Sequence, residues 1–171
     1  GTLAGQSAAA FGDAAMFSFH ATKVFHTIEG GAVACRSAEL AEKLKLERNF
    51  GITGPETTVA VGGNAKMNEF QAAMGLCNLR HLSGDIQARR RVCAAYRARL
   101  SGVPGITLPP EREGDNFAYF PVVFEGYPVG RDEVFSALAA QGVNARKYFY
   151  PLTSAFGCYA GRFDPNRTPV A

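Results

Sequence analysis

The chain has 171 residues, of which 47% are hydrophobic, and this is enough apolar material for the core of one ordinary domain or of parts of two. Its net charge of +3 suits an acidic small molecule but singles out no class of partner. No run of about 18 apolar residues and no charged-then-apolar start is present, so we expect a cytoplasmic protein without a membrane span, a membrane partner or a secretion signal.

The cysteines do not predict a metal site. Cys35, Cys77, Cys93 and Cys158 are far apart, form no C-x-x-C pair and have no nearby His at ligand spacing. Buried thiols are the simplest interpretation. We therefore expect no metal.

The two ends of the sequence lack the features of natural termini. Gly1 stands where an initiator Met is expected, and residues 164–171 stop as a loop that leads toward another element. We therefore expect an interior part of a longer chain.

Two short apolar runs near the start predict buried strands. Residues 14–19 (A-A-M-F-S-F) and 31–35 (G-A-V-A-C) have the continuous apolar character of strands that are covered on both faces. A polar loop that contains Lys23 joins them. Ser37 then has the character of an N-cap, and leucines spaced among Glu and Lys predict an amphipathic helix over 38–49.

The middle of the chain predicts a loop and two helices. Residues 51–66 are rich in glycine and contain a proline, which favours an irregular loop. The spacing of apolar residues predicts a helix from Asn68 to about Leu82. Ser83-Gly84 interrupts this pattern, and a long charged helix is expected over 85–100.

A joint rich in Pro and Gly at 102–105 separates a second region. Residues 119–124 and 143–146 have the pattern of strands, and they flank a predicted helix at 131–141. The chain therefore indicates an α/β fold in two parts that are joined through the long helix.

The most informative segment is the end of the first predicted strand, which brings the side chains of Ser18, His20 and Lys23 to the start of a loop. A lysine amine forms an imine with an aldehyde only in its neutral form, which burial beside apolar strands favours. Ser18 is placed to donate to a phosphate, and Glu29-Gly30-Gly31 allows a tight turn next to the site. From these residues alone, an exposed loop lysine remains an open alternative.

This segment resembles a known family. The runs F-S-F-H-A-T-K (17–23) and I-E-G-G-A-V (28–33) are similar to the cofactor-lysine segment of the DegT/DnrJ/EryC1/StrS sugar aminotransferases, whose fold is that of aspartate aminotransferase. The resemblance continues in the same order and spacing through Arg48–Gly51, Gly63–Leu76, Arg89–Arg91 with Tyr96, and Tyr148–Leu152. It therefore covers essentially the whole chain and is more specific than a lone S-x-x-x-x-K.

The resemblance implies the α/β fold of type I pyridoxal-phosphate-dependent transferases. The chain would hold part of the large-domain sheet and most of the smaller C-terminal α/β domain. Residues 1–82 would form the C-terminal part of the large cofactor-binding domain. Residues 83–104 would form the long connecting helix and joint, and residues 105–171 the truncated small domain.

The family implies three residues at the cofactor, pyridoxal 5'-phosphate. Lys23 would bind it covalently and later move a proton between two carbon atoms, and Ser18 would bind its phosphate. Asn64 would reach the same phosphate from the other subunit, so the resemblance implies a homodimer with shared active sites. The family's acidic partner of the pyridine nitrogen belongs upstream of these residues, so we expect this chain alone to be inactive.

The resemblance also suggests residues for the substrate. Lys66 stands where the family often has a basic residue, and it is a candidate for the diphosphate, with a solvated lysine as the alternative. His20 is a candidate for contact near the cofactor and substrate, or for a structural hydrogen bond. Tyr148 and Tyr150 follow Arg146-Lys147 and are candidates for a groove that holds a base and a diphosphate, with core packing as the alternative.

The implied activity is transamination of a nucleotide-linked keto sugar, with glutamate as the amino acid donor. The similarity is greatest to the branch that aminates C4 of a dTDP-4-keto-6-deoxyhexose. One alternative is a sugar dehydratase, but relatives with that activity carry His in place of the lysine, so Lys23 disfavours it. A second alternative is a non-catalytic regulatory protein on the same fold.

The arginines of the long predicted helix do not indicate a nucleic-acid partner. They spread around most of the helix, at 89–91, 97 and 99, with Tyr96 as the one interleaved aromatic residue. A solvated helix face is the simpler interpretation.

Overall fold

The computed structural model describes residues 1–168. The chain forms two compact units, which are described separately below. Unit 1 consists of Gly1–Arg99 with Pro110–Phe120, and unit 2 of Leu100–Pro109 with the described part of Pro121–Ala171. The residues at 169–171, which close the expected terminal loop, lie outside the described part.

Unit 1 begins with a small hairpin that the sequence analysis did not predict. Strands β1 (Thr2–Leu3) and β2 (Gln6–Ser7) pair antiparallel, and the 3-10 helix η1 (Ala8–Ala10) follows. Ala4 and Gly5 both have positive φ, which matches the right-handed twist of two-residue hairpins.

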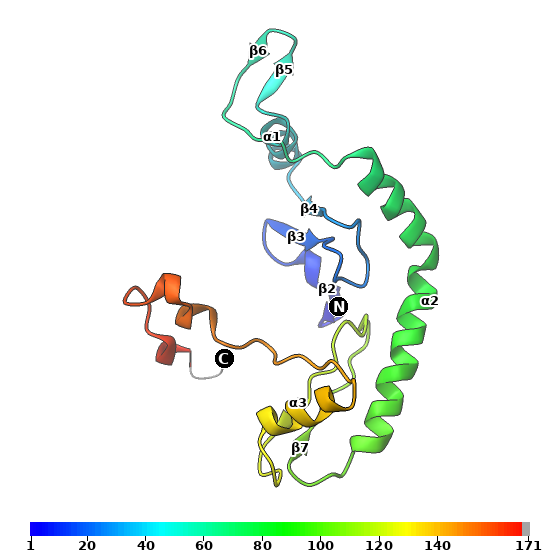
Figure 1. Cartoon of the computed structure of the whole chain (residues 1–171). Helices are drawn as coiled ribbons and strands as arrows, with labels where there is room; N and C mark the ends of the chain where they lie inside the picture. Colours follow the sequence, from blue (N-terminus) through cyan, green and yellow to red (C-terminus); the bar gives the residue numbers. More distant parts are fainter. Residues whose placement is uncertain (169–171) are drawn as a thin grey trace. The chain divides into compact units, whose positions relative to one another are not determined.

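The two predicted apolar strands are present and pair with each other. Strand β3 (Ala14–Ser18) runs antiparallel to β4 (Gly31–Cys35), with Ser18 opposite Gly31 (Figure 1). Their predicted burial on both faces is wrong for the described residues, because the sheet has two strands and Met16 is 87% exposed. Within residues 1–168, this two-stranded sheet is therefore exposed rather than covered on both faces.

Helix α1 (Ala38–Arg48) confirms the helix predicted over 38–49. The Ser37 hydroxyl accepts a hydrogen bond from the Leu40 N–H at 3.2 Å, as an N-cap should. On its surface Lys45 contacts Glu42 at 2.6 Å, a pair one turn apart.

The region predicted as an irregular loop contains a second hairpin. Strands β5 (Ile52–Gly54) and β6 (Thr57–Thr58) pair antiparallel with a register shift. Gly51 has φ +70° and lies so close to the backbone that a Cβ would fall 1.8 Å from the Ala60 oxygen. Glycine is required there because no side chain fits that approach.

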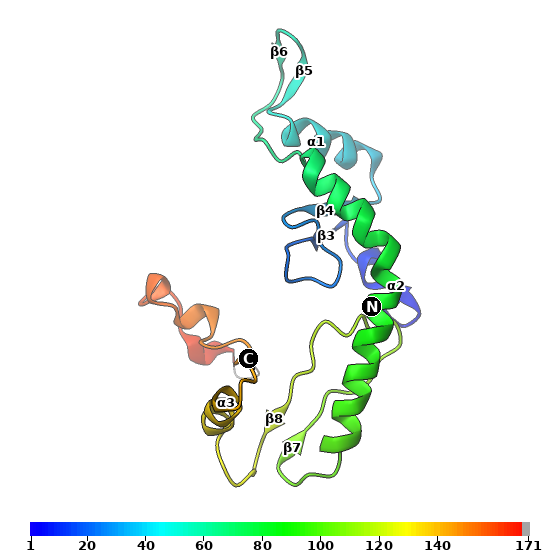
Figure 2. The same cartoon turned by 45° about the vertical axis from the view of Figure 1, so that its right-hand side comes forward.

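Helix α2 (Glu69–Leu100) is a single 32-residue helix, so the predicted break at Ser83-Gly84 is wrong (Figure 2). An exposed glycine inside a helix costs only about 1 kcal/mol, which a long helix tolerates. Its start is well defined: the Asn68 side chain accepts from the Gln71 N–H at 2.9 Å, and the Gln71 side chain accepts from the Asn68 N–H at 3.0 Å.

The returning segment Pro110–Phe120 contacts the second half of α2. Glu111 forms an ion pair with Arg90 at 3.1 Å, and the Phe120 ring stacks on Tyr96 with centroids 5.6 Å apart. The returning segment thus packs against residues of α2 that lie more than twenty positions earlier in the chain.

Unit 2 contains a short strand pair and one α-helix. Strands β7 (Ile106–Thr107) and β8 (Val123–Phe124) pair antiparallel, so most of the strand predicted over 119–124 does not form. Helix α3 (Arg131–Ala140) confirms the helix predicted at 131–141. The strand predicted at 143–146 is absent from the described structure.

The end of the described chain is a series of single turns. These are the 3-10 helices η2 (Thr153–Ala155), η3 (Gly157–Tyr159) and η4 (Pro165–Arg167). Earlier in unit 2, Lys147 reaches Asp132 at 3.1 Å in the first turn of α3. The hydrogen bond from Lys147, with a second from Arg131, lowers the pKa of the Asp132 carboxyl.

Burial within residues 1–168 is concentrated at very few positions. No hydrophobic side chain in this range is buried, and the buried residues are Thr27, Gly51 and Gly75. None of the helices described is long and apolar enough to cross a membrane. Thr27 and Gly75 belong to the loop after β3 and to α2, which are the elements that form the candidate site.

Candidate functional site

The loop that carries Lys23 joins β3 to β4 and is closed by backbone hydrogen bonds. The Phe19 N–H donates to the Gly30 carbonyl at 2.8 Å, and the Thr27 N–H donates to the Phe19 carbonyl at 2.9 Å. At the tip, the Lys23 N–H donates to the His20 carbonyl at 2.9 Å. The backbone around Lys23 is therefore held by the same strands that the sequence predicts.

Thr27 anchors the base of this loop on α2. The residue is 2% exposed, and its hydroxyl donates to the Glu29 carbonyl at 2.7 Å. Its methyl group lies against Gly75, where a Cβ would approach to 2.9 Å. Nearby, the Asn78 amide donates to the His26 carbonyl at 2.9 Å. Only a glycine on α2 allows the loop to lie this close to the helix.

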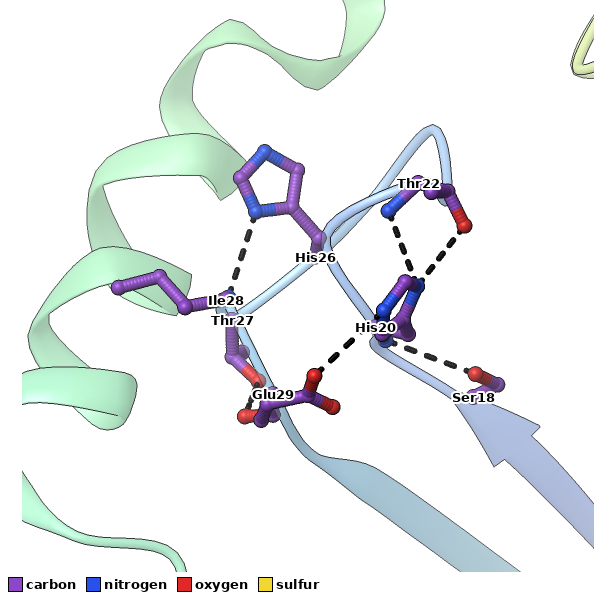
Figure 3. Close-up of polar contacts among 7 residues, drawn as sticks. All are labelled: Ser18, His20, Thr22, His26, Thr27, Ile28 and Glu29. Carbon is purple, nitrogen blue, oxygen red and sulfur yellow. Dashed lines mark hydrogen bonds and ion pairs between the residues drawn. The ribbon is translucent and has the colours of Figure 1, made fainter.

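A group of polar contacts surrounds His20 at the start of the loop (Figure 3). One ring nitrogen, Nδ1, lies 2.9 Å from the Thr22 hydroxyl and 3.3 Å from the Thr22 backbone nitrogen. The other, Nε2, lies 3.5 Å from a carboxylate oxygen of Glu29. The His20 N–H makes a long contact of 3.5 Å to the Ser18 hydroxyl. Ser18, His20 and Lys23 are therefore brought together in one segment.

Lys23 lines a cavity of about 640 Å³ within unit 1. Other lining residues come from α2, with Asp85, Arg89 and Tyr96, and from the returning segment, with Tyr119. The volume is in the range of small-molecule sites. Among residues 1–168, the half-buried Lys23 amine makes no ion pair or side-chain hydrogen bond. An unpaired amine beside a cavity of this size is available for a ligand.

A model of the DegT/DnrJ/EryC1/StrS aminotransferase family matches residues 1–171. The chain belongs to this family. As the resemblance implied, its fold is the α/β fold of type I pyridoxal-phosphate-dependent transferases.

Individual relatives agree with this assignment. The dTDP-4-amino-4,6-dideoxy-D-glucose transaminase of Shigella dysenteriae is 41% identical over 151 residues, which are 86% of this chain and 41% of that protein. The structure of DesI with its TDP-sugar product matches with a TM-score of 0.84 and 39% identity, over 94% of this chain and 42% of that one. Helicobacter pylori PseC matches with a TM-score of 0.85 and 26% identity, over 95% and 45%. The chain thus spans about two fifths of the length of such relatives.

Asn64, predicted to serve the other subunit, and Lys66, predicted to meet the substrate's diphosphate, lie just before α2. Asn64 is exposed and forms an isolated bridge with Asn49. Lys66 is exposed, and its ammonium group lies 4.5 Å from the centre of the Phe50 ring. Neither residue lines the cavity beside Lys23. Their predicted contacts with phosphate and diphosphate stay predictions.

The two predicted substrate tyrosines belong to unit 2. Tyr148 packs edge-on against Phe149, with ring centroids 4.5 Å apart. Tyr150 is exposed, and the Arg131 guanidinium lies 5.0 Å from the centre of its ring. A cation over an aromatic face holds the ring in one orientation. Contact of either tyrosine with a substrate stays a prediction.

Several residues of the site were not found from the sequence. The sequence indicated Glu29 only as part of a tight turn next to the site, but its carboxylate also lies 3.5 Å from His20. Arg89 was assigned to a solvated helix face, but it also lines the cavity. Thr27 and Gly75 carried no pattern that distinguishes them from other loop and helix residues. A glycine inside an otherwise regular helix was the one available signal for a close approach.

Proposed function

We propose that the whole protein is a pyridoxal-phosphate-dependent aminotransferase that acts on a nucleotide-linked keto sugar. The observation that carries this proposal is the unpaired amine of Lys23, on a loop closed by hydrogen bonds, at a cavity of about 640 Å³. Family membership supports the same activity. The chain covers only part of its relatives, so the activity is proposed for the whole protein.

The side chains present fit the cofactor. Pyridoxal phosphate offers an aldehyde and a phosphate, which require an amine and hydrogen-bond donors. Lys23 supplies the amine, and Ser18 supplies a hydroxyl whose own hydrogen is free to donate, because its one described contact is with a backbone N–H. Arg89 adds a positive charge to the cavity wall. Lys23 and Arg89 line the cavity, whereas Ser18 lies five residues before Lys23, outside the lining. The donors therefore match the cofactor's aldehyde and phosphate in chemical type.

Each residue would then have one role. Lys23 would hold the cofactor through its Nζ atom. Once the substrate amine has taken the place of Lys23, the free Nζ atom would accept and return the proton that moves in transamination. Ser18 would bind the phosphate through its hydroxyl. When bound, the cofactor supplies an electron sink that neither side chain can provide.

The substrate assignment rests on the relatives. The Shigella protein is named for a dTDP-linked 4-amino-4,6-dideoxyglucose, and DesI was solved with a TDP-sugar product. We infer that the substrate is a dTDP-4-keto-6-deoxyhexose and that glutamate donates the nitrogen. Lys66 would meet the diphosphate, and Tyr148 and Tyr150 would line the groove for the base.

The assembly and the domain division are part of the same proposal. We infer a cytoplasmic homodimer in which Asn64 of one subunit serves the phosphate of the other. Residues 1–82 would belong to the large domain, 83–104 to the connection and 105–171 to the small domain. Dehydration is disfavoured because Lys23 stands where sugar dehydratases of this fold carry His.

The experiment is cofactor trapping in the whole protein. The protein would be incubated with pyridoxal phosphate, reduced with borohydride and digested, and the labelled peptide identified by mass spectrometry. We expect the label on Lys23, its loss in Lys23→Ala and its retention in Lys45→Ala, a surface lysine of α1. Amination of a keto sugar nucleotide by glutamate, followed by product analysis, would then identify the carbon that receives nitrogen. A Lys23→Ala protein that still carries the label on the same peptide would refute the assignment.

A further inference from the structure

Both ring nitrogens of His20 are engaged inside the loop that carries Lys23. Nδ1 faces the hydroxyl and backbone nitrogen of Thr22, and Nε2 faces the Glu29 carboxylate (Figure 3). Thr22 immediately precedes Lys23, whereas Glu29 lies on the arm that returns to β4. The imidazole therefore bridges the two arms of the loop.

The contacts select one form of the ring. A backbone nitrogen can only donate, so Nδ1 must accept the hydrogen bond from the Thr22 N–H. The ring hydrogen then sits on Nε2, which points at the Glu29 carboxylate. The 3.5 Å separation is longer than a hydrogen bond, so the attraction is between the N–H dipole and the carboxylate charge. Nδ1 is thus taken up by Thr22, and Nε2 is directed toward Glu29.

The same residue also holds Lys23 through its backbone. The His20 carbonyl accepts the Lys23 N–H at 2.9 Å, and the His20 ring accepts the N–H of the residue before it. Two consecutive N–H groups at the loop tip are thus satisfied by one residue. Side-chain exposures of 46% for His20 and 66% for Glu29 mean that the pair adds little to overall stability. Its effect is on local geometry.

We propose that His20, together with Glu29 and Thr22, is a positioning residue that fixes the direction of the loop carrying Lys23, a role that rests on the proposed function of Lys23. It develops the structural hydrogen bond that the sequence left open for His20 beside contact with the substrate. A positioning residue changes the rate of the step in which Lys23 acts and leaves substrate binding unchanged.

The test compares three variants of the whole protein. His20→Phe keeps a planar ring and removes both nitrogens, and His20→Asn keeps an acceptor near the Nδ1 position but cannot reach Glu29. His81→Ala is the matched control, because His81 is an exposed histidine of α2 with no polar contact among residues 1–168. Hydrogen exchange of the Lys23 amide would be measured without cofactor, and kcat and KM for a keto sugar nucleotide would be measured with it.

We expect His20→Phe to speed exchange of the Lys23 amide about 10-fold. It should lower kcat on the order of 10- to 100-fold, with KM for the sugar nucleotide changed less than about 3-fold. His20→Asn should recover part of both losses, and His81→Ala should show neither. A raised KM with unchanged kcat and unchanged exchange would overturn the proposal, since it indicates substrate contact. Wild-type values in His20→Phe, or no recovery in His20→Asn, would also overturn it.

Failure of the proposed function would look different. If borohydride traps no cofactor on Lys23 of the wild-type protein, the aminotransferase assignment fails. The exchange measurement needs no cofactor, so it still decides whether His20 orders the loop. Normal trapping and turnover in the wild type, with a His20→Phe protein that behaves identically, would refute the positioning role alone.

Discussion

Replacement of Gly75 by alanine tests the closest packing in unit 1. A Cβ at this position would lie 2.9 Å from Thr27 Cγ2, which is shorter than Cβ contacts in proteins, and 3.8 Å from the Phe25 ring. Thr27 is buried and its hydroxyl is bonded to the Glu29 carbonyl, so its methyl group cannot turn away without breaking that bond. Either the loop or the helix must shift.

Two opposite effects set the size of the change. Forcing an extra methyl group into a packed contact costs about 1–3 kcal/mol. Replacing glycine by alanine inside a helix contributes about 1 kcal/mol of stability. We therefore expect Gly75→Ala to lower the free energy of unfolding by about 1 kcal/mol, within a range of roughly 0–2 kcal/mol.

Two further variants separate these effects. Gly84→Ala lies on the same helix with nothing within 4 Å of its Cβ position, so it should show the gain of about 1 kcal/mol alone. Thr27→Ser removes the clashing methyl group and keeps the hydroxyl. In that background Gly75→Ala should become stabilising, which gives a coupling between the two sites.

The assay is thermal denaturation of the whole protein at fixed protein and cofactor concentrations, because binding and association shift the midpoint. The decisive quantity is the sign of the Gly75→Ala effect in each background. If Gly75→Ala stabilises the protein that keeps Thr27 by as much as Gly84→Ala does, the close contact between Gly75 and Thr27 is refuted. Equal destabilisation in the presence and absence of Thr27→Ser would show that the cost does not arise from the Thr27 methyl group.

Further predictions concern the cofactor, the dimer and a thiol. Ser18→Ala should weaken pyridoxal phosphate affinity by about 1–3 kcal/mol in a titration, and unchanged affinity in a folded variant would favour packing. Asn64→Ala and Lys23→Ala should each be inactive, but subunit exchange should restore up to one working site per mixed dimer. Verified heterodimers that stay inactive would exclude a shared site. Burial raises the pKa of the Cys93 thiol, so iodoacetamide at pH 7–8 should alkylate Cys93 more slowly than the exposed Cys77. The rate at Cys93 should increase as the pH is raised, because more of the thiol is then ionised. Equal rates at the two cysteines would contradict this prediction.

Short-range features of the fold were predicted well from the sequence. The strands over β3 and β4, the N-cap at Ser37 and the helix over 131–141 depend on the character of neighbouring residues and are found within a residue or so of the predicted bounds. The family was also recognised from ordered motifs, and the family match confirms it. These features depend on local propensity and on spacing along the chain.

Secondary-structure predictions failed where the local sequence pattern was weak or where the structure offered no pairing partner. Ser83-Gly84 was interpreted as a helix break, but a single weak position does not outweigh the continuous hydrogen bonding of α2. The hairpin of β5 and β6 was missed because its strands are too short to alternate. The strand predicted at 143–146 had the right residue types and no partner in the described structure, and a strand needs one.

The sequence by itself determined that Lys23 follows a strand, that Ser18 ends that strand and that the chain belongs to an aminotransferase family. Only the tertiary structure decided what surrounds the lysine. The packing of Thr27 on Gly75 and the cavity wall from α2 join residues that lie about fifty or more positions apart in the chain. Propensity and periodicity describe the preferences of neighbouring residues, whereas such contacts depend on the path of the whole backbone. Even within the loop, the His20 ring lies 3.5 Å from the Glu29 carboxylate on the returning arm, a contact that no local pattern specifies.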